Sequence, residues 1–158
     1  IGMMGFSGGA MLTGWCATKF DQGNPEAADP VERCSSRPDA AVLCYGAGSW
    51  LPVSKGLLGY DRARFAKFAE DAIERNVTPA CPPFFIWQCA GMDDPRNATQ
   101  LTDVLTACGV PFELHIFPYG AHGTALSNEM HPSESANDPH VARWVDLCCE
   151  WLRRYQHF

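Results

Sequence analysis

Residues 1–20, IGMMGFSGGAMLTGWCATKF, contain the sequence that decides the fold class. Residues 1–6 form an apolar run that ends directly at Ser7, and the residues after Gly9 are apolar at helical spacing. This order predicts a strand, a sharp turn and a helix, with Ser7 on the turn. In the Gly-x-Ser-x-Gly pattern of residues 5–9, side chains at Gly5 and Gly9 are expected to obstruct the close approach of strand and helix.

The rest of the chain continues to alternate between strand-like and helix-like patterns. Strands are predicted at 40–45, 84–89 and 111–119, helices at 61–76, 96–108 and 139–155, and a polar surface loop at 21–39. Such alternation indicates an α/β fold: a parallel sheet of about four strands between helices, in three αβα layers. We interpret residues 1–158 as a single, partial domain in which residues 46–83 form an irregular excursion plus a helix between the second and third strands.

The overall composition narrows the range of partners. The chain is 46% hydrophobic and 19% charged, with a net charge of -6 and a pI of about 5.2. These values give no basic surface for nucleic acid or for an anionic membrane, so neither is an expected partner. No apolar run reaches the roughly 18 residues of a membrane helix, and residues 1–10 lack the basic start and cleavage site of a signal peptide.

The eight cysteines do not indicate a disulfide scaffold or a metal site. None forms a CxxC pair or a Cys/His pair at zinc spacing, and several lie inside apolar runs. We interpret them as mostly reduced core residues, which favours a cytoplasmic location. No metal or cofactor is expected.

A serine needs a base to act as a nucleophile at neutral pH, and five histidines are candidates. His122 stands apart because the sequence Gly120-Ala121-His122-Gly123 lies just beyond the carboxyl end of the strand at 111–119. Ser7 is expected at the same edge of the sheet, and the small neighbours allow the imidazole to turn towards it. His122 is therefore the predicted base.

The acid that orients the histidine should follow the strand at 84–89. Asp93 and Asp94 come directly after it, in FFIWQCAGMDDPRN. Counting from the strand end favours Asp93, whereas the Asp-Pro-Arg sequence and the turn favour Asp94, our preferred choice of the two. Asp94 could instead be only the N-cap of the next helix, with Pro95 at the first position. The order Ser, Asp, His along the chain is that of α/β-hydrolases.

Several motifs together resemble the acetyl-xylan-esterase-like, or BD-FAE-like, α/β-hydrolases. They are GFSGGAMLTG, PDAAVLCYG, NVTPACPPFFIWQC, GVPFELHIFPYGAHGTAL and DPHVARWVDLCCEWL, and they run through most of the chain. The resemblance implies the C-terminal half of an α/β-hydrolase fold, with Ser7 as nucleophile, His122 as base and Asp94 or Asp93 as acid. The acid loop departs from the family, which usually has a longer D-x-x-V-P turn.

The resemblance also bears on the oxyanion hole. The backbone N–H of Gly8 can supply one donor, and the family takes the second from an HGGG-type loop that precedes the elbow and has no counterpart in these residues. The first strand would also have an apolar open edge. We expect a missing N-terminal segment or a partner to cover that edge.

The predicted function is hydrolysis of a small-molecule carboxylic ester through an acyl-enzyme, and the resemblance implies acetyl groups on sugars or xylan as substrates. Tyr45, Trp50 and Met92 are candidates for the wall of the substrate pocket. Two alternatives remain open: a prolyl-oligopeptidase-type serine peptidase, and a catalytically inactive binding domain.

Overall fold

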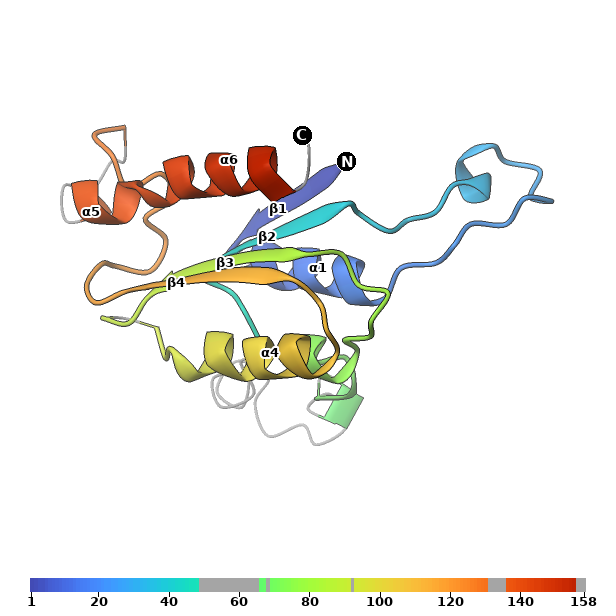
Figure 1. The fold of residues 1–158 in the computed structure, drawn as a ribbon, viewed down its shortest axis with the longest axis horizontal. Coiled ribbons are helices and arrows are strands. Elements are labelled where there is room, and N and C mark those ends of the chain that lie inside the picture. The colour runs from blue at the N-terminus through green and yellow to red at the C-terminus, as the bar shows by residue number, and fades with distance from the viewer. Residues whose placement is uncertain (49–65, 68, 92, 131–135, 156–158) are drawn as a thin grey trace.

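The structure is a computed structural model that describes residues 1–48, 66–67, 69–91, 93–130 and 136–155. Four parallel strands form one sheet in the order β1-β2-β3-β4 (Figure 1). The strands are Gly2–Phe6 (β1), Ala40–Cys44 (β2), Phe84–Cys89 (β3) and Phe112–Phe117 (β4). The helices are Gly8–Thr18 (α1), Arg96–Ala107 (α4), Pro139–Ala142 (α5) and Trp144–Tyr155 (α6), with 3-10 turns at Val31–Arg33 (η1) and Ile73–Arg75 (η2).

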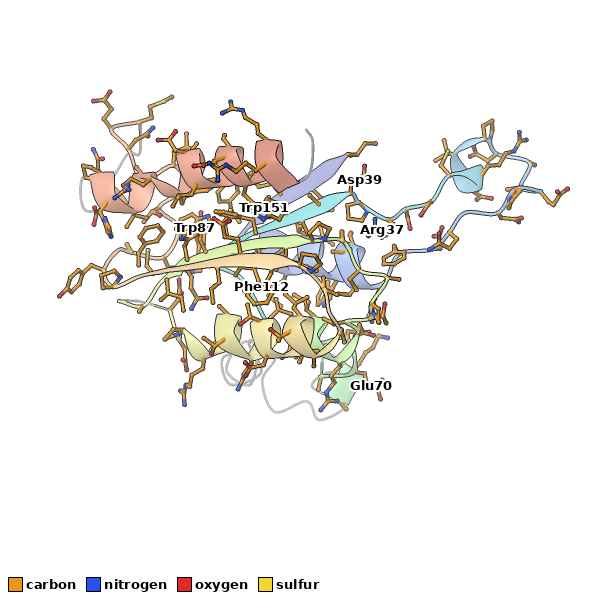
Figure 2. The ribbon with its side chains drawn as sticks, viewed as in Figure 1. Arg37, Asp39, Glu70, Trp87, Phe112 and Trp151 are labelled. Atoms are coloured by element: carbon orange, nitrogen blue, oxygen red, sulfur yellow. The ribbon has the colours of Figure 1, made fainter. Side chains whose placement is uncertain are left out.

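Helices cover both faces of the sheet. Helices α1 and α4 lie on one face and α5 and α6 on the other, which confirms the predicted three-layer α/β architecture (Figure 1). Right-handed crossovers between neighbouring parallel strands place successive connecting helices on the same side. Trp87 and Trp151 lie between the sheet and α6, whereas Phe112 points to the layer of α4 (Figure 2).

The burial of each strand follows from its place in the sheet. Every residue of β2 and β3 is buried because these central strands are covered on both faces, in keeping with their continuous apolar sequences AAVLC and FFIWQC. The outer strands are more exposed, and Met4 in β1 is 46% exposed. Strands β1 and β2 end opposite each other, at Phe6 and Cys44, as do β3 and β4, at Cys89 and Phe117, while Cys44 lies opposite Trp87, two residues before the end of β3. The loops that follow them therefore gather at one edge.

Two predicted helices differ from the observed ones. The helix expected at 139–155 is interrupted at Arg143, which forms a one-residue turn between α5 and α6. The helix expected at 61–76 lies partly outside the described residues. Residues 66–67 and 69–70 are helical, but Ala72 is extended, with ψ 134°, and η2 follows. This bend places the buried Ile73 against α1, where a Cβ on Gly14 would lie 2.4 Å from Ile73 Cδ1.

The cysteines occupy mainly interior positions. All eight are free thiols; Cys34 is exposed, three are partly buried, and four are buried: Cys44, Cys81, Cys89 and Cys148. The expected interior position is thus confirmed for these four cysteines. Among the described residues, the helices are all too short or too polar to span a bilayer.

Candidate active site

Ser7 lies on a strained turn between β1 and α1. Its φ of 53° and ψ of -120° are unusual for a residue with a side chain, and its N–H donates to Cys44 O at 2.9 Å. A Cβ on Gly5 would lie 2.0 Å from Gly9 O, so the strand and helix approach as closely here as predicted. The same prediction is wrong for Gly9, because a Cβ there would meet nothing within 4 Å. Gly9 contributes only its backbone carbonyl to this contact, and a residue of any type has that group.

A further glycine supports the elbow, and the sequence analysis did not identify it. Gly46 follows the end of β2, and a Cβ on it would lie 2.2 Å from Ser7 O and 2.7 Å from Ala10 Cβ. The backbone of the elbow therefore rests directly on the backbone of the neighbouring loop. The available signal was the position of Gly46 just after the strand expected beside the Ser7 strand.

The structure brings Ser7, His122 and Asp93 into one hydrogen-bonded chain. Ser7 Oγ lies 2.7 Å from His122 Nε2, and His122 Nδ1 lies 2.8 Å from Asp93 Oδ1. An ionised carboxylate only accepts hydrogen bonds, so Nδ1 carries the hydrogen and Nε2 accepts from the serine hydroxyl. The side chains of His122 and Asp93 are 31% and 11% exposed, so the histidine is accessible while its carboxylate is largely shielded.

Asp94 faces away from this chain, which corrects the preference for Asp94 over Asp93. Its carboxylate accepts from the backbone N–H of Arg96 at 2.9 Å and from the Arg96 guanidinium, which holds the pKa of Asp94 below its usual value. Its backbone oxygen accepts from the buried side chain of Gln88 at 3.0 Å. Asp94 thus holds the turn that leads into α4, but it is not the N-cap that was expected as the alternative, because α4 begins at Arg96 and its N-cap is Pro95.

The candidate pocket residues are only partly described. Tyr45 is 4% exposed and its ring lies 5.1 Å from the His122 ring, centroid to centroid, in an edge-on arrangement. It packs against the histidine, and its place in a pocket wall remains a prediction. Trp50 and Met92 lie outside the described residues.

The predicted oxyanion donor is well placed by its position in the helix. Gly8 is exposed and is the first residue of α1, where backbone N–H groups have no acceptor within the helix. The positive end of the helix dipole is close to Ser7 for the same reason. The role of Gly8 remains a prediction. In the described parts of the chain, no three metal-binding side chains gather into a possible metal site.

Comparisons with known proteins support the fold. No protein-family model matches the chain. Endo-1,4-beta-xylanase B of Butyrivibrio fibrisolvens is 31% identical over 137 residues, which are 80% of this chain and 21% of the xylanase. The acetyl ester-xyloside bifunctional hydrolase of Caldicellulosiruptor lactoaceticus has a TM-score of 0.80 and 34% identity, over 97% of this chain and 56% of that one. A sugar hydrolase of Lactococcus lactis has a TM-score of 0.76 and 28% identity, over 98% and 58%.

The parallel sheet, its two helical layers and the serine on the strained turn define part of an α/β-hydrolase fold. The resemblance of the chain to acetyl-xylan-esterase-like members of the α/β-hydrolase superfamily is confirmed by the solved structures. The chain spans just over half the length of these two structures.

Proposed function

We propose that this chain carries the catalytic triad of a serine esterase. Ser7 is the nucleophile, His122 is the base and Asp93 is the acid. The single observation that supports the proposal most directly is the pair of hydrogen bonds of 2.7 and 2.8 Å that join the three side chains. This arrangement is that of a nucleophile activated by a base whose second nitrogen is held by a carboxylate.

The proposed reaction proceeds in two halves. As Ser7 Oγ attacks the carbonyl carbon, its proton passes to His122 Nε2, and Asp93 stabilises the resulting imidazolium. The Gly8 N–H donates to the developing oxyanion. The histidine then protonates the leaving alcohol, which leaves an acyl group on Ser7. Water, deprotonated by His122, attacks the acyl-enzyme, and His122 returns the proton to Ser7 Oγ as the bond to the acyl group breaks, which releases the carboxylic acid and restores the free serine.

An acetyl ester on a sugar or on xylan is the substrate class that we propose. The name of the similar Caldicellulosiruptor hydrolase combines an acetyl ester with a xyloside, and the curated relative is a xylanase. The first similarity favours an ester over a peptide substrate, and the second supports the link to xylan. Because the chain spans only part of each relative, the activity proposed is that of the whole protein.

The test measures hydrolysis of p-nitrophenyl acetate and release of acetate from acetylated xylan by the full-length protein and by Ser7→Ala. We expect both activities in the wild type, with a pre-steady-state burst of nitrophenol, and a fall of about 10⁴-fold or more in Ser7→Ala. A Ser7-dependent cleavage of prolyl peptides without ester hydrolysis would contradict the proposal in favour of a peptidase. A folded protein that cleaves neither class would indicate a binding domain.

A further inference from the structure

The loop that carries His122 is held by hydrogen bonds to two buried aromatic side chains. Both of them bond to the backbone of Ala125. Tyr45 Oη accepts from the Ala125 N–H at 3.2 Å, and Trp144 Nε1 donates to Ala125 O at 3.0 Å. We propose that Tyr45 and Trp144 are positioning residues, which set the reach of His122 to Ser7 by fixing Ala125. This inference rests on the proposed function and extends it to residues that do not touch the reacting atoms.

The loop needs such support because its backbone is strained. Ala125 and Ser127 have φ angles of 49° and 52°, in the left-handed region that residues with a Cβ rarely adopt. Strained conformations persist only where the surrounding structure determines them fully. Ala125 is three residues from His122, so loss of either hydrogen bond lets the strain relax close to the base.

The two aromatic side chains form a stiff support. The Tyr45 ring lies 5.1 Å from Trp87, edge to face, and Trp87 stacks on Trp144 at 4.9 Å with 18° between the planes. Tyr45, Trp87 and Trp144 are all nearly inaccessible to solvent. Burial also raises the pKa of the Tyr45 hydroxyl above its ordinary value.

One dipeptide at the end of β2 links both partners of the proposed proton transfer. Cys44 O accepts the N–H of Ser7 at 2.9 Å, and the next residue, Tyr45, holds the His122 loop through Ala125. The Tyr45 ring also contacts the imidazole itself. The positions of Ser7 and His122, and so the distance between them, are thereby both set by the buried end of β2. A displacement of about 1 Å at such a distance is enough to cost roughly 100-fold in rate.

The test compares Tyr45→Phe and Trp144→Phe, which keep an aromatic ring and remove one hydrogen bond each, with matched controls. Tyr119→Phe is the tyrosine control because Tyr119 is 77% exposed, and Trp151→Phe is the tryptophan control because Trp151 is buried on α6 against Phe85. Active sites are titrated with a fluorophosphonate, so that rates refer to folded, reactive molecules. Hydrogen exchange of residues 120–127 is measured on the same samples.

We expect each positioning variant to lower kcat by about 10- to 100-fold with KM within about twofold, since transition-state geometry and not ground-state binding is affected. The kcat of the double variant should be only slightly below the kcat of the less active single variant, because both hydrogen bonds hold Ala125. Exchange of the loop amides should be faster in both variants. The controls should leave kcat and loop exchange unchanged.

Unchanged kcat per titrated site and unchanged loop exchange in Tyr45→Phe and Trp144→Phe would overturn the positioning role, as would a fall in melting temperature alone. If the wild type shows no Ser7-dependent activity, the proposed function fails. In that case the exchange measurement still decides whether Tyr45 and Trp144 hold the loop, and unaltered exchange would overturn that too.

Discussion

His122 and Asp93 are 29 residues apart in the sequence and 2.8 Å apart in the structure, measured from Nδ1 to Oδ1. Asp94, the next residue, accepts hydrogen bonds from the backbone and the side chain of Arg96 instead. Adjacent aspartates thus have separate tasks, one at the histidine and one at the start of a helix. Asp93 Oδ2 is buried with no hydrogen-bond partner among the described residues, so the orientation of this carboxylate depends strongly on His122.

The two aspartates form a matched pair of variants. Asp93→Asn should lower kcat of ester hydrolysis by about 10⁴-fold, because an amide in place of the carboxylate favours the wrong histidine tautomer. Asp94→Asn should change kcat by less than about threefold, since the bonds lost lie at an exposed turn. Steady-state kinetics on p-nitrophenyl acetate measures both effects. The reverse order of losses would assign the acid to Asp94.

The glycines of the elbow should respond differently to alanine. Gly46→Ala forces a Cβ against the Ser7 carbonyl and should cost about 1–3 kcal/mol of unfolding free energy, with slower fluorophosphonate labelling. Gly9→Ala enters open space and should change stability by less than about 0.5 kcal/mol. Urea unfolding of the two variants provides the comparison. Equal destabilisation would show that the close contact of the two backbones is not as described.

The cysteines should react with Ellman's reagent in an order set by burial. Cys34 is exposed and should be modified first in the native protein. The buried Cys44, Cys89 and Cys148 should react only at the rate of unfolding, because burial raises their pKa values and restricts access. Mass spectrometry of peptides after brief labelling identifies the modified thiol. Rapid native labelling of Cys44 would contradict the packing of β2.

Stability should decline in alkaline solution. Burial raises the pKa of Cys44 and of Cys148 from 9.0 to about 12, so between these values the unfolded chain loses protons that the folded chain keeps. The unfolding free energy is therefore expected to be level below about pH 8 and to fall as the pH rises above about 9. Urea titrations across this range measure the slope. Cys34→Ser should leave the slope unchanged, whereas an equal slope in Cys148→Ala would contradict the explanation.

Most of the fold could be predicted because the apolar patterns are unambiguous. The continuous apolar runs at 84–89 and 40–45 have the length and composition of buried strands, and parallel pairing places the carboxyl ends of all four strands at one edge. The choice between Asp93 and Asp94 could not be predicted, because it depends on which way a short loop turns after β3. The side chain of Arg96 bonds to Asp94, two residues earlier, and so decides which aspartate is left to face His122. A pattern of strands and helices does not encode this contact.

The support of the site was also beyond sequence reasoning, for a different physical reason. Tyr45 and Ala125 are 80 residues apart, and their hydrogen bond exists only once β2 and the loop after β4 meet at the sheet edge. Gly46 is required by the backbone of another segment, at Ser7, and its position just after a predicted strand is the only sign of that in the sequence. Local patterns predict elements, whereas these contacts arise between elements.

The most direct test of the central claim is the site of fluorophosphonate attachment in the full-length protein, determined by peptide mass spectrometry. The Ser7 hydroxyl donates to His122 Nε2 at 2.7 Å, so we expect a single phosphonyl adduct on the peptide that contains Ser7, at a rate that falls sharply in His122→Ala. Ser7→Ala should remain unlabelled while keeping its fold. Labelling at another residue, or none in the folded wild type, would contradict the account.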